Sequence, residues 1–275
     1  MQIAGDAAAC TAPLTPAFLN AVPHAQEIIV PRAAHAAWHS SATWLPQLLS
    51  AYRQIAAQRI PEVPPPASLS DLPLIEEPAQ GAGDLFAVFL SGDGGWAGID
   101  KNIAAALVAR GIPVAGLDSL RYFWTARTPQ GLAADLDRML RYYAFHWKRP
   151  HALLIGYSQG ADVLPFAINR LSAAAHGRVV LGALLGLDDR ADFEFHVTSW
   201  VLNGASGLPV RPEVARLGVA AVCIYGDDDA DSLCPHLQDL KQIRVVKLAG
   251  GHHFNGDYDA VAQVVMGAAL HARPN

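Results

Sequence analysis

Short apolar runs alternate with helix-like segments through most of the chain after residue 84. The apolar runs occupy 85–90, 112–117, 152–155, 179–187, 219–225 and 243–248. Helical patterns occupy 100–110, 129–147, 159–171 and 257–271. Short buried runs separated by helices are typical of a mostly parallel sheet with helices on both faces, so the pattern predicts an α/β fold. Right-handed crossovers then place the strand-to-helix turns at one edge of the sheet, where ligands bind.

The first 67 residues do not follow this alternation. The sequence PEVPPP at 61–66 cannot join a helix or a central strand, so 61–67 is predicted to be a linker before a domain at 68–275. Residues 1–60 loosely repeat the C-terminal part of the chain. The matching features are Gly5 with Gly226, Cys10 with Cys234, 27–30 with 244–247, and His35 with His252. This repeat predicts that residues 1–60 are the tail of an upstream domain of the same type.

Composition and charge exclude several classes of protein. Apolar residues make up 52% of the chain and charged residues 16%, which is the opposite of a disordered sequence. The net charge is -5 and there is no basic stripe, so no nucleic-acid partner is expected. No apolar run approaches the roughly 18 residues that span a bilayer. We expect no signal peptide in this chain, because a basic segment followed by an apolar one is missing at its start.

The strongest chemical motif is the sequence Gly-Tyr-Ser-Gln-Gly at 156–160. It fits G-x-S-x-G between a predicted strand and a predicted helix, the setting in which glycines let a sharp turn expose a nucleophilic serine. The motif therefore predicts that Ser158 is a nucleophile. The alternative is an ordinary glycine-rich turn whose serine caps the helix.

A serine nucleophile needs a base and an acid later in the chain. The run at 219–225 is followed by the acidic turn 226–231, in which Asp229 or Asp231 could serve as the acid. The run at 243–248 is followed by a glycine pair and two histidines, of which we favour His252 over His253 as the base. The order serine, aspartate, histidine supports the three assignments jointly.

The remaining requirement is a pair of backbone N–H groups for the oxyanion. Gln159 supplies one by its position after the serine, and Asp93 or Gly94 in the turn after 85–90 can supply the other. Near the same edge, Tyr122 and Trp124 are candidates for substrate contact, with core packing as the alternative.

The sequence alone leaves two further features undecided. Asp162, four residues after the serine, either faces the pocket or offsets Arg170. Cys223 and Cys234 form either a disulfide or two unrelated thiols. No cysteine or histidine spacing typical of a metal site occurs, and neither a metal nor an organic cofactor is expected.

The ordered set of motifs resembles one bacterial family. SGDGGW, DSLRYFW, GYSQGADVLPF, LLGL followed by ADFEFHVTSW, YGDDDADSLC and GGHHF together resemble the VirJ/AcvB bacterial virulence protein family, from about Leu72 to the C-terminus. The resemblance implies an α/β hydrolase fold and a periplasmic location. It also implies a triad of Ser158, His252 and Asp231 or the nearby Asp229.

The resemblance carries a specific expectation about activity. AcvB-type members release lysine from lysyl-phosphatidylglycerol, so the implied substrate is an aminoacylated phospholipid headgroup at a membrane surface. These members carry two VirJ-like domains, which would make residues 1–60 the end of the first. The family is also linked to type IV secretion, whose components are candidate partners. The alternatives are a general carboxylesterase or thioesterase, and a non-catalytic periplasmic protein that assists secretion.

Overall fold

The computed structural model describes residues 68–194 and 207–272, together with the short stretches 2–5, 20–21, 27–30, 45–46 and 49–50. The chain divides into two compact units, residues 1–63 and 64–275, and the boundary falls inside the expected linker. In the first unit, β1 (Gln2–Gly5) and β2 (Glu27–Val30) pair in parallel. The linker itself and most of the expected upstream tail lie outside the described residues. The assignment of residues 1–60 to a second domain of the same type therefore stays a prediction.

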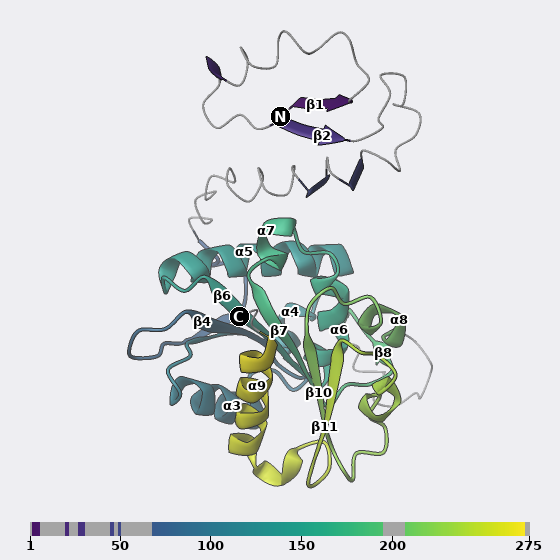
Figure 1. Ribbon diagram of the computed structural model, residues 1–275. Helices are drawn as coiled ribbons and strands as arrows, with labels where there is room; N and C mark the ends of the chain where they lie inside the picture. The colour runs from purple at the N-terminus through teal and green to yellow at the C-terminus, as the bar shows by residue number, and fades with distance from the viewer. Residues whose placement is uncertain are drawn as a thin grey trace. The chain divides into compact units, whose positions relative to one another are not determined.

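The second unit is built on a seven-stranded sheet (Figure 1). Its strand order is β11-β10-β7-β6-β4-β5-β3. The bounds are β3 Leu74–Glu77, β4 Leu85–Leu90, β5 Val114–Leu117, β6 His151–Tyr157, β7 Val179–Leu185, β10 Ala221–Gly226 and β11 Ile243–Leu248. All neighbouring pairs are parallel except β3, which runs antiparallel to β5 at the edge. The predicted α/β fold with a mostly parallel sheet is thus confirmed.

The central strands are apolar on both sides because helices cover both faces of the sheet. In β4 all six residues are buried. Phe86, Val88 and Leu90 pack in the core on one face, and the alternate residues 85, 87 and 89 pack in the core on the other. This is why the strand is an uninterrupted apolar run in the sequence. β3, with the sequence LIEE, is partly exposed at the edge of the sheet and is not one of the predicted apolar runs.

The long helices divide between the two faces. α3 (Gly98–Val108) and α9 (Tyr258–Ala272) pack against each other on one face, and α5 (Pro129–His146) and α6 (Gln159–Ile168) pack together on the other (Figure 1). The shorter elements are α4 Ser119–Tyr122, α7 Ala173–His176, β8 Arg190–Ala191, β9 Leu208–Pro209, α8 Arg211–Val214, η2 Cys234–Leu237 and η3 Phe254–Gly256. None of the helices in the described part of the chain is both long and apolar enough to cross a membrane.

Candidate active site

Ser158 occupies a sharp turn between β6 and α6. Its φ of 51° lies in the left-handed region, an unfavourable conformation for a residue with a side chain. A side chain at Gly156 would collide with the carbonyl of Gly160, and a side chain at Gly160 would collide with two backbone carbonyls at the end of β4. The two glycines of the motif are therefore required by the close approach of these segments. The Ser158 side chain makes no capping hydrogen bond to α6, which argues against the helix-capping alternative.

His252 and Asp229 are hydrogen-bonded to each other. His252 Nδ1 lies 2.9 Å from Asp229 Oδ2, and only 10% of the Asp229 side chain is exposed. Asp231 is exposed and is not the carboxylate that His252 contacts. Of the two acids that the sequence left open, the structure thus brings Asp229 to the histidine.

Two hydrogen bonds join the acidic loop after β10, which carries Asp229, to the histidine loop after β11, which carries His252. The Gly250 N–H donates to Asp227 Oδ1 at 2.7 Å, and the Asp228 N–H donates to the Gly250 carbonyl at 2.9 Å. Gly226 lies so close to the carbonyls of this second loop that a side chain there would overlap them. The turn that follows, closed by the Asp229 N–H donating to the Gly226 carbonyl at 3.0 Å, directs Asp229 toward His252.

A disulfide closes the acidic loop. Cys223 on β10 and Cys234 at the start of η2 are bonded, with their Cα atoms 5.6 Å apart and a sequence separation of 11. Both cysteines are fully buried. Of the two alternatives that the sequence left open, a disulfide or two unrelated thiols, the structure has the disulfide. This bond joins both ends of the segment that carries Asp229.

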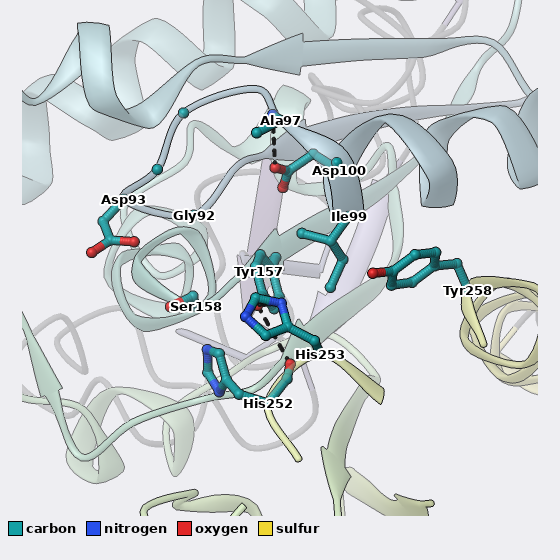
Figure 2. A pocket seen from close by; sticks show the side chains of 13 residues that line it. Gly92, Asp93, Ala97, Ile99, Asp100, Tyr157, Ser158, His252, His253 and Tyr258 are labelled. Carbon is teal, nitrogen blue, oxygen red and sulfur yellow. Dashed lines mark hydrogen bonds between the residues drawn. The ribbon is translucent and has the colours of Figure 1, made fainter. Parts of the chain in front are cut away.

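Ser158 and His252 line one cavity of about 400 Å³ at the carboxyl edge of the sheet. Figure 2 shows Ser158 between His252 and the turn between β4 and α3, which carries Gly92 and Asp93. The lining residues are Gly92, Asp93, Gly94, Gly95, Ala97, Gly98, Ile99, Asp100, Tyr157, Ser158, His252, His253 and Tyr258. The expected oxyanion donors Asp93 and Gly94 are therefore at the cavity. Gln159 is the first residue of α6, so its N–H has no partner within the helix.

Asp100 is a cavity residue that the sequence did not single out. It is 2% exposed, and its Oδ2 accepts the Ala97 N–H at 3.3 Å. Its Oδ1 is buried without a hydrogen-bond partner among the described residues. Burial raises the pKa of this carboxyl to about 6. The sequence carries a local signal for this residue, because an acidic residue in the first turn of a helix directly after a glycine-rich turn often caps the helix.

The other expected substrate contacts lie elsewhere. Tyr122 is fully buried in the core, where its hydroxyl donates to Asp135 at 2.6 Å, so it takes the core-packing alternative. Trp124 is 65% exposed and is not among the residues that line the cavity. Tyr122 ends α4, a single helical turn whose buried residues are Ser119 and Tyr122.

Asp162 follows neither of the two expectations. It is buried on α6 and accepts the Asp188 N–H at 2.8 Å, and burial holds the pKa of its carboxyl well above its usual range. Arg170 pairs with Glu213 instead. Asp162 therefore supports the backbone after β7 and is not one of the cavity-lining residues. Within the described ranges, no group of three or more His, Cys, Asp or Glu side chains is placed to hold a metal ion.

The sequence matches the family model described as bacterial virulence protein (VirJ) over residues 84–273. The chain belongs to the VirJ family. No curated protein matches the sequence. The VirJ region includes every cavity-lining residue, so the resemblance stated from the motifs is confirmed over the whole site.

Solved structures with the same fold are α/β hydrolases. MenH from S. aureus has a TM-score of 0.55 at 12% identity, covering 73% of this chain and 99% of its own. The putative non-heme bromoperoxidase BpoC from Mycobacterium tuberculosis has a TM-score of 0.53 at 16% identity, covering 74% and 97%. A lipase-esterase related protein from Clostridium acetobutylicum has a TM-score of 0.51 at 12% identity, covering 71% and 98%. This VirJ chain therefore has an α/β hydrolase fold resembling that of esterases.

Proposed function

We propose that this chain is a serine hydrolase that cleaves the aminoacyl ester of an aminoacylated phospholipid such as lysyl-phosphatidylglycerol. The observation that carries the hydrolase part is the 2.9 Å contact between His252 Nδ1 and Asp229 in the cavity that Ser158 also lines. A carboxylate at Nδ1 keeps the proton on that nitrogen and leaves Nε2 free to accept one.

In the proposed reaction, His252 Nε2 removes the proton of Ser158 Oγ as the oxygen attacks the ester carbonyl. The backbone N–H of Gln159 and that of Asp93 or Gly94 stabilise the negative oxygen. The ester C–O bond then breaks, and the lipid alcohol leaves with the proton from His252. Water, deprotonated by His252, attacks the aminoacyl-serine. The bond between the acyl carbon and Ser158 Oγ then breaks, His252 returns the proton to Oγ, and the amino acid is released. Asp229 remains ionised throughout and stabilises the imidazolium. The chain's own residues thus supply each proton transfer.

The substrate class has two supports. One is the resemblance to AcvB-type members described above. The other is the charge of the cavity, whose wall carries the carboxyl groups of Asp93 and Asp100 beside the expected oxyanion donors. Such a wall favours an acyl group that bears an ammonium and disfavours a fatty-acid anion.

We also propose a periplasmic location, because a disulfide such as Cys223–Cys234 persists in oxidising compartments. Contact with a membrane surface follows from the proposed substrate. A part in type IV secretion stays a prediction from the family resemblance.

The test compares two esters and two serine variants. We expect the purified chain to release lysine from vesicles that contain lysyl-phosphatidylglycerol, faster than it hydrolyses a short-chain nitrophenyl ester. Ser158→Ala should abolish both activities. Ser70→Ala is the matched control, because Ser70 is exposed and does not line the cavity.

Each outcome bears on a different part of the proposal. Equal rates on the two esters would favour a general carboxylesterase, which is the second candidate function. Full activity in Ser158→Ala would refute the serine mechanism. Secretion or virulence that persists when hydrolysis is abolished would favour the non-catalytic role.

A further inference from the structure

Tyr157 links the two halves of the proposed catalytic site. It is the last residue of β6, directly before Ser158, and is 4% exposed. Its hydroxyl lies 3.1 Å from His253 Nδ1 and 3.4 Å from the carbonyl oxygen of His252. The Tyr157 ring is centred 5.3 Å from the His252 ring, and Figure 2 shows it between the serine turn and the histidine loop.

We infer that Tyr157 is a positioning residue that fixes the distance of His252 from Ser158 and the orientation of its ring. This inference rests on the proposed function. Tyr157 contacts the backbone carbonyl of His252, whereas Asp229 contacts the ring through Nδ1.

The hydrogen bond to Asp229 does not by itself fix the position of His252. One hydrogen bond at Nδ1 restrains rotation of the imidazole, but it does not fix how far the backbone at 252 stands from the serine. The side chain of His252 is 37% exposed, so packing alone does not hold it. The phenol contacts the backbone carbonyl of that same residue and the ring of the next one, and both contacts act on the position of the loop.

Tyr157 is held in place by β6, a strand in the interior of the sheet. β6 pairs with β4 on one side and β7 on the other, so Tyr157 projects from the interior of the sheet. The ring also limits the β4–α3 turn, because a Cβ added at Gly92 would lie 3.1 Å from the Tyr157 ring carbon Cδ1. The Tyr157 side chain therefore lies beside the β4–α3 turn, contacts the histidine loop at 252 and 253, and is adjacent in sequence to Ser158.

The hydroxyl retains its proton under working conditions. Burial, together with the charges of Asp100 and other nearby acids, raises the pKa of Tyr157 above the ordinary value of a tyrosine, which is already well above neutral. A neutral phenol can donate one hydrogen bond and accept another. It can therefore donate to the His252 carbonyl while accepting from His253 Nδ1–H, which accounts for both observed contacts.

The test uses Tyr157→Phe, which removes only the hydroxyl, and Tyr143→Phe as the matched control. Tyr143 is also fully buried and donates its hydroxyl to Glu76 at 2.9 Å, but it lies on α5 and does not line the cavity. Each variant loses the hydroxyl of one buried tyrosine, which has two hydrogen-bond contacts in Tyr157 and one in Tyr143, so thermal unfolding of both variants measures the cost in stability. A loss of activity that comes from stability alone would follow that cost in each variant.

We expect Tyr157→Phe to lower kcat about 10- to 100-fold with KM changed less than about twofold, since misplacing a catalytic group by a fraction of an ångström to 1 Å has such effects. Tyr143→Phe should retain kcat. The second readout is the downfield proton resonance of His252 Nδ1–H bonded to Asp229, which should shift or broaden in Tyr157→Phe and stay unchanged in Tyr143→Phe.

An unchanged kcat and an unchanged resonance in Tyr157→Phe would overturn the inference, as would equal kcat losses in the two variants. The resonance separates this result from a failure of the proposed function. If the parent chain hydrolyses no ester, the proposed function fails, and the shift or constancy of the His252 resonance still decides whether Tyr157 positions that ring.

Discussion

Replacing Asp229 by asparagine would remove the negative charge that His252 faces and leave the shape of the loop nearly unchanged. The side chain is 10% exposed and its Oδ2 lies 2.9 Å from His252 Nδ1. In the proposed mechanism, His252 becomes an imidazolium in the transition state. A neutral amide cannot stabilise that cation as a carboxylate does, and it can also present an N–H to Nδ1 and so favour the unproductive tautomer.

The magnitude follows from the charge separation. Two unit charges about 4 Å apart interact by about 4 kcal/mol at an effective dielectric constant of about 20, the value suited to a pair near a protein surface. Since 1.36 kcal/mol corresponds to a factor of ten in rate, kcat should fall about 10³-fold. The KM should change little, because the interaction develops only in the transition state.

Asp231→Asn provides the matched comparison. It changes the net charge by the same amount in the same loop, but Asp231 is exposed and is not the residue bonded to His252. Steady-state hydrolysis by both variants, with thermal unfolding to verify that each is folded, measures the difference. The reasoning is refuted if Asp229→Asn retains kcat or if Asp231→Asn loses more activity than Asp229→Asn.

Three further predictions concern the support of the site. Replacing Cys223 and Cys234 together by serine should lower the free energy of unfolding, measured in urea titrations, by about 3 kcal/mol, the loop-closure value for residues 11 apart. A free energy of unfolding that does not change when a reducing agent is added to the parent chain would contradict this prediction. Gly160→Ala should cost about 3 kcal/mol, because its Cβ overlaps two carbonyls, whereas Gly267→Ala, with open space around it, should not lower the melting temperature. The pKa of Asp100 is raised to about 6 from 3.8, so the native state binds this proton more tightly than the unfolded chain. Its stabilising contribution is present below about pH 4 and is lost by about pH 6, so Asp100→Asn should gain about 3 kcal/mol relative to the parent between pH 4 and 7, and parallel pH curves in urea titrations would refute this.

The fold and the sharp turn at Ser158 could be predicted from the sequence because their signals are local. A strand such as β4, buried on both faces, must be apolar at every position, and that requirement is visible without any tertiary information. The turn at Ser158 likewise needs glycine at 156 and 160, because the serine turn brings backbone carbonyls against both positions.

The acid expected to act with Ser158 was predicted only as a pair of alternatives. Asp229 and Asp231 are chemically equivalent in the sequence, and the turn closed on Gly226 decides which of them reaches His252. Tyr157 stood inside the motif as an unspecified position. Its contacts with His252 and His253 join residues about 95 positions apart, and no periodicity encodes them.

The sequence by itself thus determined the layers of this protein, the sharp bend that carries Ser158 and the order of the groups that could act with it. Only the tertiary structure decided that Asp229 meets His252, that Cys223 bonds Cys234, and that Tyr122 packs in the core instead of at the cavity. The physical reason is that burial and turn formation are properties of neighbouring residues. A hydrogen bond between loops depends on where distant strands end.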